Sequence, residues 1–235
     1  MTHIIAMGGG GFSMEPDNLA LDRYILDQTG KPHPKVCFLP TAGAESYEYT
    51  VKFYSALTRL GAEPSHLSLF RLPTADLRGF ILEKDVIYVG GGNTRSLLAL
   101  WREWGLDDIL REAWLNGTVL AGLSAGAICW FEQGVTDSVP GQLSSLPCLG
   151  YLPGSACPHY HSEPDRQLDT HRLLLTGKIK PGFGIDNSTA LHFTGGKLKQ
   201  VVRSTDNTNA CYYYLNEGKV IEEVLPAVDL PACKP

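Results

Sequence analysis

The chain has 235 residues, 43% of them hydrophobic and 19% charged, and its formal net charge is −5. A chain of this length can bury a substantial core without disulfides or metals, and a small net charge at this hydrophobicity excludes an intrinsically disordered protein. No run of lysines or arginines supplies the basic stripe that binding to a phosphate backbone requires, so we expect no nucleic-acid partner.

Short apolar runs alternate with helical patterns in the first half of the chain. The apolar runs cover residues 3–7, 36–39, 66–70, 86–89 and 119–121. Short continuous apolar runs predict strands covered on both faces, as in a parallel sheet. Helical spacing recurs between them, in segments that begin near Tyr47, Asn93 and Asp107 and end near Gly61, Gly105 and Gly117. Strands alternating with helices predict a doubly wound, mostly parallel α/β sheet.

The pattern of the sequence changes after about residue 180, where the helical spacing ends and short strand-like runs follow one another. Strand-like runs at residues 184–185, 190–193, 200–203, 210–215 and 220–224 are separated by glycine- and asparagine-rich turns. This spacing predicts an antiparallel meander appended to the parallel core, followed by a loosely held tail over residues 225–235. Because no linker separates two parts of the chain, we expect one domain spanning residues 1–235.

The amino terminus lacks the basic segment of a secretion signal, and no window reaches the ~20 apolar residues of a membrane span. The six cysteines are scattered, with no Cys-x-x-Cys pair, which is typical of reduced thiols rather than of a disulfide framework. We therefore expect a cytoplasmic protein without a membrane partner.

Residues 122–126 form the pattern Gly-Leu-Ser-Ala-Gly between a buried strand and the start of a helix. At such an elbow a serine occupies a strained turn, and the flanking glycines let neighbouring backbone approach closely. The hydroxyl then projects from the carboxyl end of the sheet, near the positive end of the following helix. A glycine-rich turn with a capping serine would give the same spacing, but the strand–turn–helix setting favours Ser124 as a nucleophile.

A serine nucleophile needs a base, and the chain has seven histidines. His159 follows Pro158 in an extended segment downstream of the elbow. His159 and His161 would share one face of a strand, which is the geometry of a metal-binding pair. No aspartate or glutamate at ligand spacing completes such a site, so we expect no metal.

Two glycine-rich loops, at residues 8–11 and 90–92, follow strands and open helices. Neither matches a dinucleotide-binding fingerprint or a phosphate-binding P-loop, so no nucleotide cofactor is expected. The second loop suits an anion-binding turn at a helix start, which is the chemistry of an oxyanion hole.

Three motifs together resemble the peptidase E family, the aspartyl dipeptidases and relatives such as the cyanophycinases. They are Val-Gly-Gly-Gly-Asn-Thr at residues 89–94, Gly-Leu-Ser-Ala-Gly-Ala at 122–127 and Pro158-His159, in the order and approximate spacing of that family. Phe-Leu-Pro-Thr-Ala-Gly at 38–43 also fits, and the match covers roughly residues 1–195. The resemblance implies a three-layer α/β/α sandwich similar to class I glutamine amidotransferases, with a serine in place of the elbow cysteine.

The resemblance also implies which residues carry the reaction. Ser124 would be the nucleophile and His159 the general base. The backbone amides of Gly92 and Ala125 would form the oxyanion hole.

Two further roles depend on charged residues. Asp137 is the family's choice for the third member of the triad, with Glu132 and Asp186 as alternatives. Arg166 is the nearest match to the arginine that binds the substrate's aspartate carboxylate in the family. The segment that links Arg166 to His159 is shorter here than in the family, which puts strict aspartyl specificity in doubt.

The implied activity is that of a serine peptidase that releases an N-terminal acidic residue from small peptides through an acyl-enzyme, without a cofactor. There are two alternatives. The first is an amidase or esterase that acts on other small substrates, and the second is a binding protein that keeps the fold without catalysis. The partner would be a small peptide, and a homodimer is left open.

Overall fold

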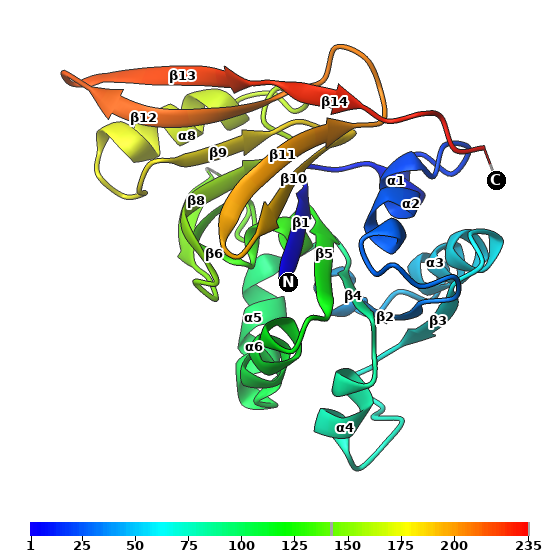
Figure 1. The fold of residues 1–235 in the computed structure, drawn as a ribbon. Coiled ribbons are helices and arrows are strands. Elements are labelled where there is room, and N and C mark those ends of the chain that lie inside the picture. Colours follow the sequence, from blue (N-terminus) through cyan, green and yellow to red (C-terminus); the bar gives the residue numbers. More distant parts are fainter. Residues whose placement is uncertain (142, 235) are drawn as a thin grey trace.

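The computed structural model describes residues 1–141 and 143–234, and its larger sheet has the strand order β14-β11-β10-β1-β5-β4-β2-β3 (Figure 1). In chain order these strands are β1 (His3–Met7), β2 (Lys35–Leu39), β3 (Glu63–His66), β4 (Val86–Val89), β5 (Val119–Leu123), β10 (Thr189–Thr194), β11 (Lys197–Arg203) and β14 (Ala227–Asp229). The pairs from β1 through β5, β4 and β2 to β3 are parallel, whereas β10 is antiparallel to β1.

Helices cover both faces of the parallel strands. In chain order the helices of the described residues are α1 (Gly11–Met14), α2 (Ala20–Asp27), the short 3-10 helix η1 (Thr41–Gly43), α3 (Tyr47–Arg59), α4 (Leu77–Leu82), α5 (Thr94–Glu103), α6 (Leu106–Leu115), α7 (Ala125–Ile128) and α8 (Arg166–Leu175), the last of which packs on the smaller sheet. In β1, Ile4 and Ala6 join the core cluster of α5 and α6, whereas Ile5 and Met7 join that of α2 and α3. Figure 1 shows these two groups of helices on opposite sides of the sheet. Burial on both faces explains why the strands read as continuous apolar runs.

The smaller sheet has the strand order β13-β12-β9-β8-β6-β7. Its strands are β6 (Phe131–Thr136), β7 (Ser144–Pro147), β8 (Leu152–Pro158), β9 (Gly182–Ile185), β12 (Ala210–Asn216) and β13 (Lys219–Leu225). Leu173 and Leu174 of α8 share a buried cluster with Tyr213 of this sheet. Trp130, just before β6, belongs to the same core cluster as Trp101 of α5, so the two sheets share a buried core.

The parallel half of the fold follows the prediction. Strands β1, β2, β4 and β5 form where the apolar runs place them, and the side chain of Asn93 caps α5 by accepting a hydrogen bond from the Ser96 N–H at 2.9 Å. The strand predicted over residues 66–70 is displaced, because β3 ends at His66. Beyond that residue the backbone leaves the sheet, where the Glu45 carboxylate accepts a hydrogen bond from the Leu69 N–H at 2.7 Å.

The strands after residue 180 correct the prediction of one meander. The antiparallel pairs are present, but β9, β12 and β13 lie in the smaller sheet while β10 and β11 extend the larger one. Parallel pairing with β8 draws β9 into the smaller sheet. The chain then crosses to the larger sheet in the turn 186–188, where Ser188 has a φ of 59°. The α/β class is confirmed, and the likeness to amidotransferases stays a prediction.

The carboxyl-terminal tail is held more firmly than the sequence predicts. Strand β14 pairs with β11 in the parallel sense. Beyond it, the Cys233 carbonyl accepts a hydrogen bond from the Leu19 N–H at 2.8 Å, and the Cys233 N–H donates to the side chain of Asn18 at 3.0 Å. The tail therefore fixes the start of α2.

Candidate active site

Ser124 joins strand β5 to helix α7. Its φ of 54° and ψ of −115° lie outside the regions that residues with a Cβ prefer, so the turn is strained. A Cβ on Gly122 would lie 2.3 Å from the Gly126 carbonyl oxygen, and one on Gly126 would lie 2.3 Å from that of Val89. The two glycines therefore permit the turn, and the serine is presented at the carboxyl end of a central strand, as the pattern predicts.

His159 lies directly after strand β8, in a left-handed conformation with a φ of 54°. Its Nε2 is 2.9 Å from Ser124 Oγ. The Tyr160 N–H donates to the Ile185 carbonyl at 3.1 Å, which fixes the turn that carries the histidine. The predicted nucleophile and base thus meet although their strands belong to different sheets.

The other ring nitrogen of His159 faces an amide. Nδ1 lies 2.6 Å from Asn187 Oδ1 in the turn between the sheets. Because an amide oxygen only accepts hydrogen bonds, this contact assigns the ring proton to Nδ1 and leaves Nε2 to accept the serine hydroxyl proton. The backbone N–H of Asn187 donates to Ser162 Oγ at 3.0 Å, and this bond holds Asn187 against the turn that carries His159.

Asp137, the acid expected to orient His159, forms a salt bridge with Arg166 instead. Nη2 of Arg166 donates to Asp137 Oδ2 at 2.9 Å, and Nε donates to Glu163 Oε2 at 2.6 Å. Arg166 is 4% exposed, so its guanidinium is buried against two carboxylates. In the structure Asp137 therefore pairs with Arg166 rather than with His159, and the arginine expected to bind a substrate carboxylate is already paired within the chain.

The two alternative acids are also engaged elsewhere. Glu132 accepts a hydrogen bond from Lys180 Nζ at 2.8 Å, and Asp186 accepts one from the His161 N–H at 2.9 Å. Asp186 immediately precedes Asn187, the residue whose side chain contacts the histidine. Orientation of the histidine does not require a carboxylate, because an amide oxygen accepts the same hydrogen bond.

The glycine loop after β4 lies against the serine. A Cβ on Gly91 would be 3.2 Å from the Cβ of Ser124, and Gly92 has a φ of 134°, which favours glycine. On the other side of the serine, Ala125 is the first residue of α7, so its N–H has no acceptor within the helix. The structure thus brings the two predicted sources of oxyanion-hole amides to the elbow.

The loop after β1 packs on the histidine and its amide partner. A Cβ on Gly9 would lie 2.2 Å from Asn187 Oδ1 and 3.0 Å from His159 Nδ1, and one on Gly8 would lie 2.3 Å from the Asp186 carbonyl oxygen. These positions therefore require glycine because of the close approach. The glycine-rich loop at residues 8–11, which was compared with phosphate-binding loops in the sequence, covers the His159–Asn187 pair.

A cavity of about 370 Å³ opens beside His159. It is lined by Ser13, Met14, Ser46, Glu48, Tyr49, Lys52, Gly91, Leu123 and His159. The Tyr49 hydroxyl accepts a hydrogen bond from the Gly91 N–H at 3.1 Å, and burial raises the pKa of Tyr49, so the hydroxyl keeps its proton. This cavity is the candidate substrate pocket.

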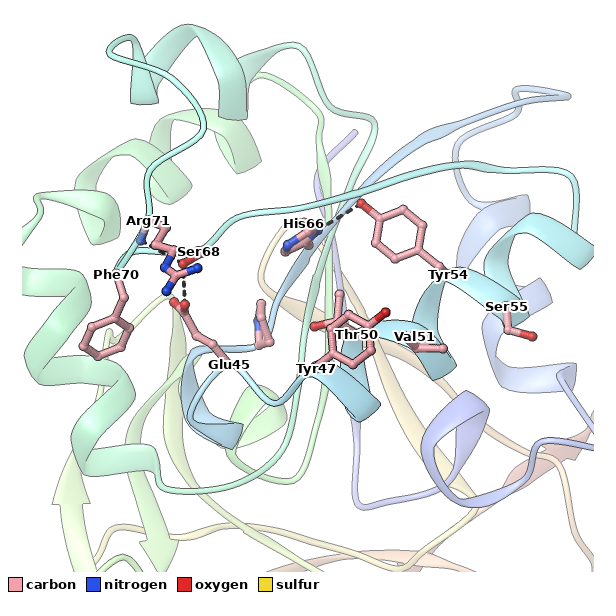
Figure 2. A pocket seen from close by; sticks show the side chains of 11 residues that line it. Glu45, Tyr47, Thr50, Val51, Tyr54, Ser55, His66, Ser68, Phe70 and Arg71 are labelled. Atoms are coloured by element: carbon pink, nitrogen blue, oxygen red, sulfur yellow. Dashed lines mark hydrogen bonds between the residues drawn. The ribbon is translucent and has the colours of Figure 1, made fainter.

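A second cavity, of about 730 Å³, lies against another face of α3. In Figure 2 the Tyr54 hydroxyl points at His66, which lies 2.9 Å from it at Nδ1, and Ser68 and Arg71 lie beside Glu45. Neither the serine nor the histidine of the elbow lines this cavity. Helix α3 and the loop before it therefore stand between the two cavities.

No metal site is apparent in the described ranges, where no group of three or more histidine, cysteine or carboxylate side chains is arranged to hold an ion. Nδ1 of His161 lies 3.0 Å from Asp186 Oδ1, a pairing within the chain. No helix among residues 1–141 and 143–234 is long and apolar enough to cross a membrane.

The fold and this site define an α/β protein with a serine and a histidine paired at a strand–helix elbow. The model of peptidase family S51 matches residues 4–201. The chain therefore belongs to peptidase family S51, which confirms its resemblance to the peptidase E family and makes it a peptidase by membership.

Proteins similar to this chain are also described as peptidases. It is 56% identical over 226 residues to "Uncharacterized peptidase YgaJ" of Bacillus subtilis (strain 168), covering 96% of this chain and 98% of that protein. It is 30% identical over 198 residues to Peptidase E of Haemophilus influenzae, covering 79% and 87%. The crystal structure of a peptidase from an acI-B1 Actinobacterium superposes with a TM-score of 0.70 at 21% identity, covering 99% and 97%, which supports the fold.

Proposed function

We propose that the protein is a serine peptidase in which Ser124 is the nucleophile and His159 the general base. One observation carries the proposal: Ser124 Oγ lies 2.9 Å from His159 Nε2, while Nδ1 of the same ring is held by Asn187. A nucleophile, a base and a group that orients the base are the three parts that serine catalysis requires.

The reaction follows from these positions. Ser124 Oγ attacks the carbonyl carbon of the scissile peptide while its proton moves to His159 Nε2. The N–H groups of Gly92 and Ala125 donate to the oxyanion that develops. The histidine returns the proton to the nitrogen of the leaving amine, and an ester to Ser124 remains. Water, deprotonated by His159, then hydrolyses this ester and restores the free serine.

Asn187 gives this base a neutral partner. Its oxygen fixes the orientation and tautomer of His159 but adds no negative charge to stabilise the imidazolium that forms during attack. A carboxylate at this position does both. We therefore propose Asn187 as a positioning residue, with a smaller electrostatic contribution than an aspartate or glutamate would make.

Short peptides are the substrate class that we propose, and an N-terminal acidic residue is the finer part of the proposal. That preference rests on the resemblance to peptidase E, whose members include aspartyl dipeptidases. Arg166 donates to Asp137 and Glu163, so a substrate carboxylate that bound it would have to displace one of them. The preference is measured directly by comparing Asp-Xaa with Asn-Xaa dipeptides.

A fluorophosphonate probe, which labels activated serines, tests the proposal together with a dipeptide assay. We expect labelling of the wild type, none of Ser124→Ala, and a loss of turnover by about 10⁴- to 10⁶-fold in that variant. Ser55→Ala, an exposed serine of α3, is the matched control and keeps both signals. A wild type that takes no label would overturn the proposal in favour of a binding protein. Labelling with turnover of esters or simple amides alone would favour the amidase or esterase.

A further inference from the structure

We propose that Lys52 of helix α3 binds a carboxylate of the substrate in the cavity beside His159. The inference rests on the proposed peptidase function and adds a specificity residue to it. The carboxylate has two sources in a short peptide, an acidic side chain or the free carboxyl terminus, and the experiment below separates them.

The position of the cavity makes it part of the reaction site. Gly91 and His159 both line it, and Gly91 packs against the nucleophile, since a Cβ there would lie 3.2 Å from that of Ser124. A volume of about 370 Å³ lies at the lower end of the range of ligand pockets, roughly 300–1,000 Å³, and suits a ligand of the size of a dipeptide.

The chemistry of the lining points to a charged ligand end. Leu123 and Met14 supply apolar surface, and the hydroxyls of Ser13 and Ser46 supply polar contacts. Among the lining residues that the structure describes, Lys52 is the one lysine or arginine and Glu48 the one carboxylate. A substrate carboxylate bound in this cavity can therefore form a charge-assisted hydrogen bond with the ammonium group of Lys52.

Lys52 differs from Arg166 in having its charge available. Arg166 is buried and donates to two carboxylates. In contrast, the ion pairs formed by residues 1–141 and 143–234 include neither Lys52 nor Glu48, which lies one helical turn before Lys52 and is also exposed. A substrate carboxylate reaches Lys52 without displacing a partner of the chain.

Helix α3 holds Lys52 in a fixed relation to the oxyanion loop. Tyr49 lies one turn before Lys52, and its hydroxyl accepts a hydrogen bond from the Gly91 N–H at 3.1 Å. The Tyr49 ring packs so closely that a Cβ on Gly90 would lie 2.8 Å from its Cε1. A carboxylate bound at Lys52 is thus placed relative to the elbow by a rigid element rather than by a loop.

The test is the set of specificity constants of Lys52→Gln and of its control Arg59→Gln, which removes a positive charge from the same helix outside the cavity. Each variant is assayed on Asp-Xaa and Asn-Xaa dipeptides and on the same dipeptides with amidated carboxyl termini. Fluorophosphonate labelling of Ser124 is recorded for every variant. An exposed charge pair is screened by water, so the expected loss in Lys52→Gln is about tenfold.

We expect that loss only on substrates that carry the recognised carboxylate, mainly in KM, with Ser124 labelling unchanged. A loss confined to Asp-Xaa identifies the acidic side chain, and a loss confined to free carboxyl termini identifies the terminus. Lys52→Arg should restore part of the loss. Equal constants for Lys52→Gln and Arg59→Gln on all four substrates would overturn the inference while labelling still supported the serine peptidase. Absence of labelling in the wild type would overturn the proposed function instead.

Discussion

Oδ1 of Asn187 lies 2.6 Å from Nδ1 of His159, in the place where a carboxylate completes a Ser–His–Asp triad. The two residues come from turns that follow β8 and β9, which are parallel neighbours in the smaller sheet. Parallel pairing brings the carboxyl ends of both strands to one edge of the sheet. The base and its partner are therefore aligned by a strand register rather than by a flexible loop.

Replacing Asn187 tests this alignment. Asn187→Ala should lower kcat by about 10- to 100-fold with KM little changed, because the ring of His159 loses its orientation and only part of the rate depends on a neutral partner. Asn187→Asp adds a negative charge beside the ring, so the acid limb of the pH profile of kcat/KM should move to higher pH. A kcat for Asn187→Ala within twofold of the wild type would contradict the assignment.

Gly9→Ala should abolish most activity without unfolding the protein. The new Cβ would lie 2.2 Å from Asn187 Oδ1, so the amide must move away from the histidine. Gly30→Ala is the control, since nothing lies within 4 Å of its Cβ although its φ of 64° makes the substitution mildly destabilising. Thermal unfolding and kcat are measured for both variants. Equal activity of the two variants would argue against this contact.

Asp22 should make the stability of the protein depend on pH. Burial raises the pKa of its carboxyl to about 7, although the Tyr88 hydroxyl donates to Oδ1 at 2.9 Å, and Oδ2 has no hydrogen-bond partner among the described residues. The folded state therefore binds this proton more tightly than the unfolded state, whose carboxyl has a pKa near 3.8. Stability is lost as the pH rises from about 4 to about 7 and stays low above that.

Asp22→Asn introduces a neutral side chain of the same shape, so the variant does not lose stability when the pH rises and a buried carboxyl would ionise. We expect the variant to be more stable than the wild type at pH 8, by on the order of 1–4 kcal/mol, and to differ little at pH 4. Urea unfolding at both pH values measures the difference. If the difference in the free energy of unfolding between the variant and the wild type were larger at pH 4 than at pH 8, the stability would not depend on ionisation of Asp22 as expected.

Asp137→Asn should leave kcat within about threefold of the wild type, because its carboxylate contacts Arg166 and not His159. Asn187→Ala, assayed in parallel, provides the reference for loss of an orienting group. A fall by about 10³-fold or more for Asp137→Asn, typical of a triad acid, would restore the original assignment. Loss of the salt bridge should appear mainly as a lower midpoint of thermal unfolding.

Residues 122–126 show what a local pattern can predict. A glycine on each side of Ser124 and an apolar run before it specify a turn, a strand and an exposed hydroxyl within a few residues, because each preference acts over a short stretch of backbone. His159 was found by the resemblance of its motif. Its φ of 54° could not be predicted from the sequence, because only a few per cent of residues other than glycine adopt a positive φ, although histidine is among the types enriched there.

Asn187 and the late strands show what such patterns leave open. Apolar alternation identifies β9, β10 and β12 as strands, but the choice of sheet depends on which edge is free to accept hydrogen bonds, a property of the whole fold. The sequence therefore predicts a hairpin turn at residues 186–188, where the structure has the connection between the two sheets. A hairpin turn within one sheet gives no reason to expect the side chain of Asn187 beside His159.

The position of β1 between β5 and β10 has a consequence for biosynthesis. Strand β1 gains its second neighbour only when residues 189–194, which follow Asn187, have left the ribosome. Pairings this distant in sequence form late. A chain that stops before Asn187 therefore carries the elbow serine without an aligned histidine, and hydrolytic activity should appear only after residues 187–194 have been synthesised.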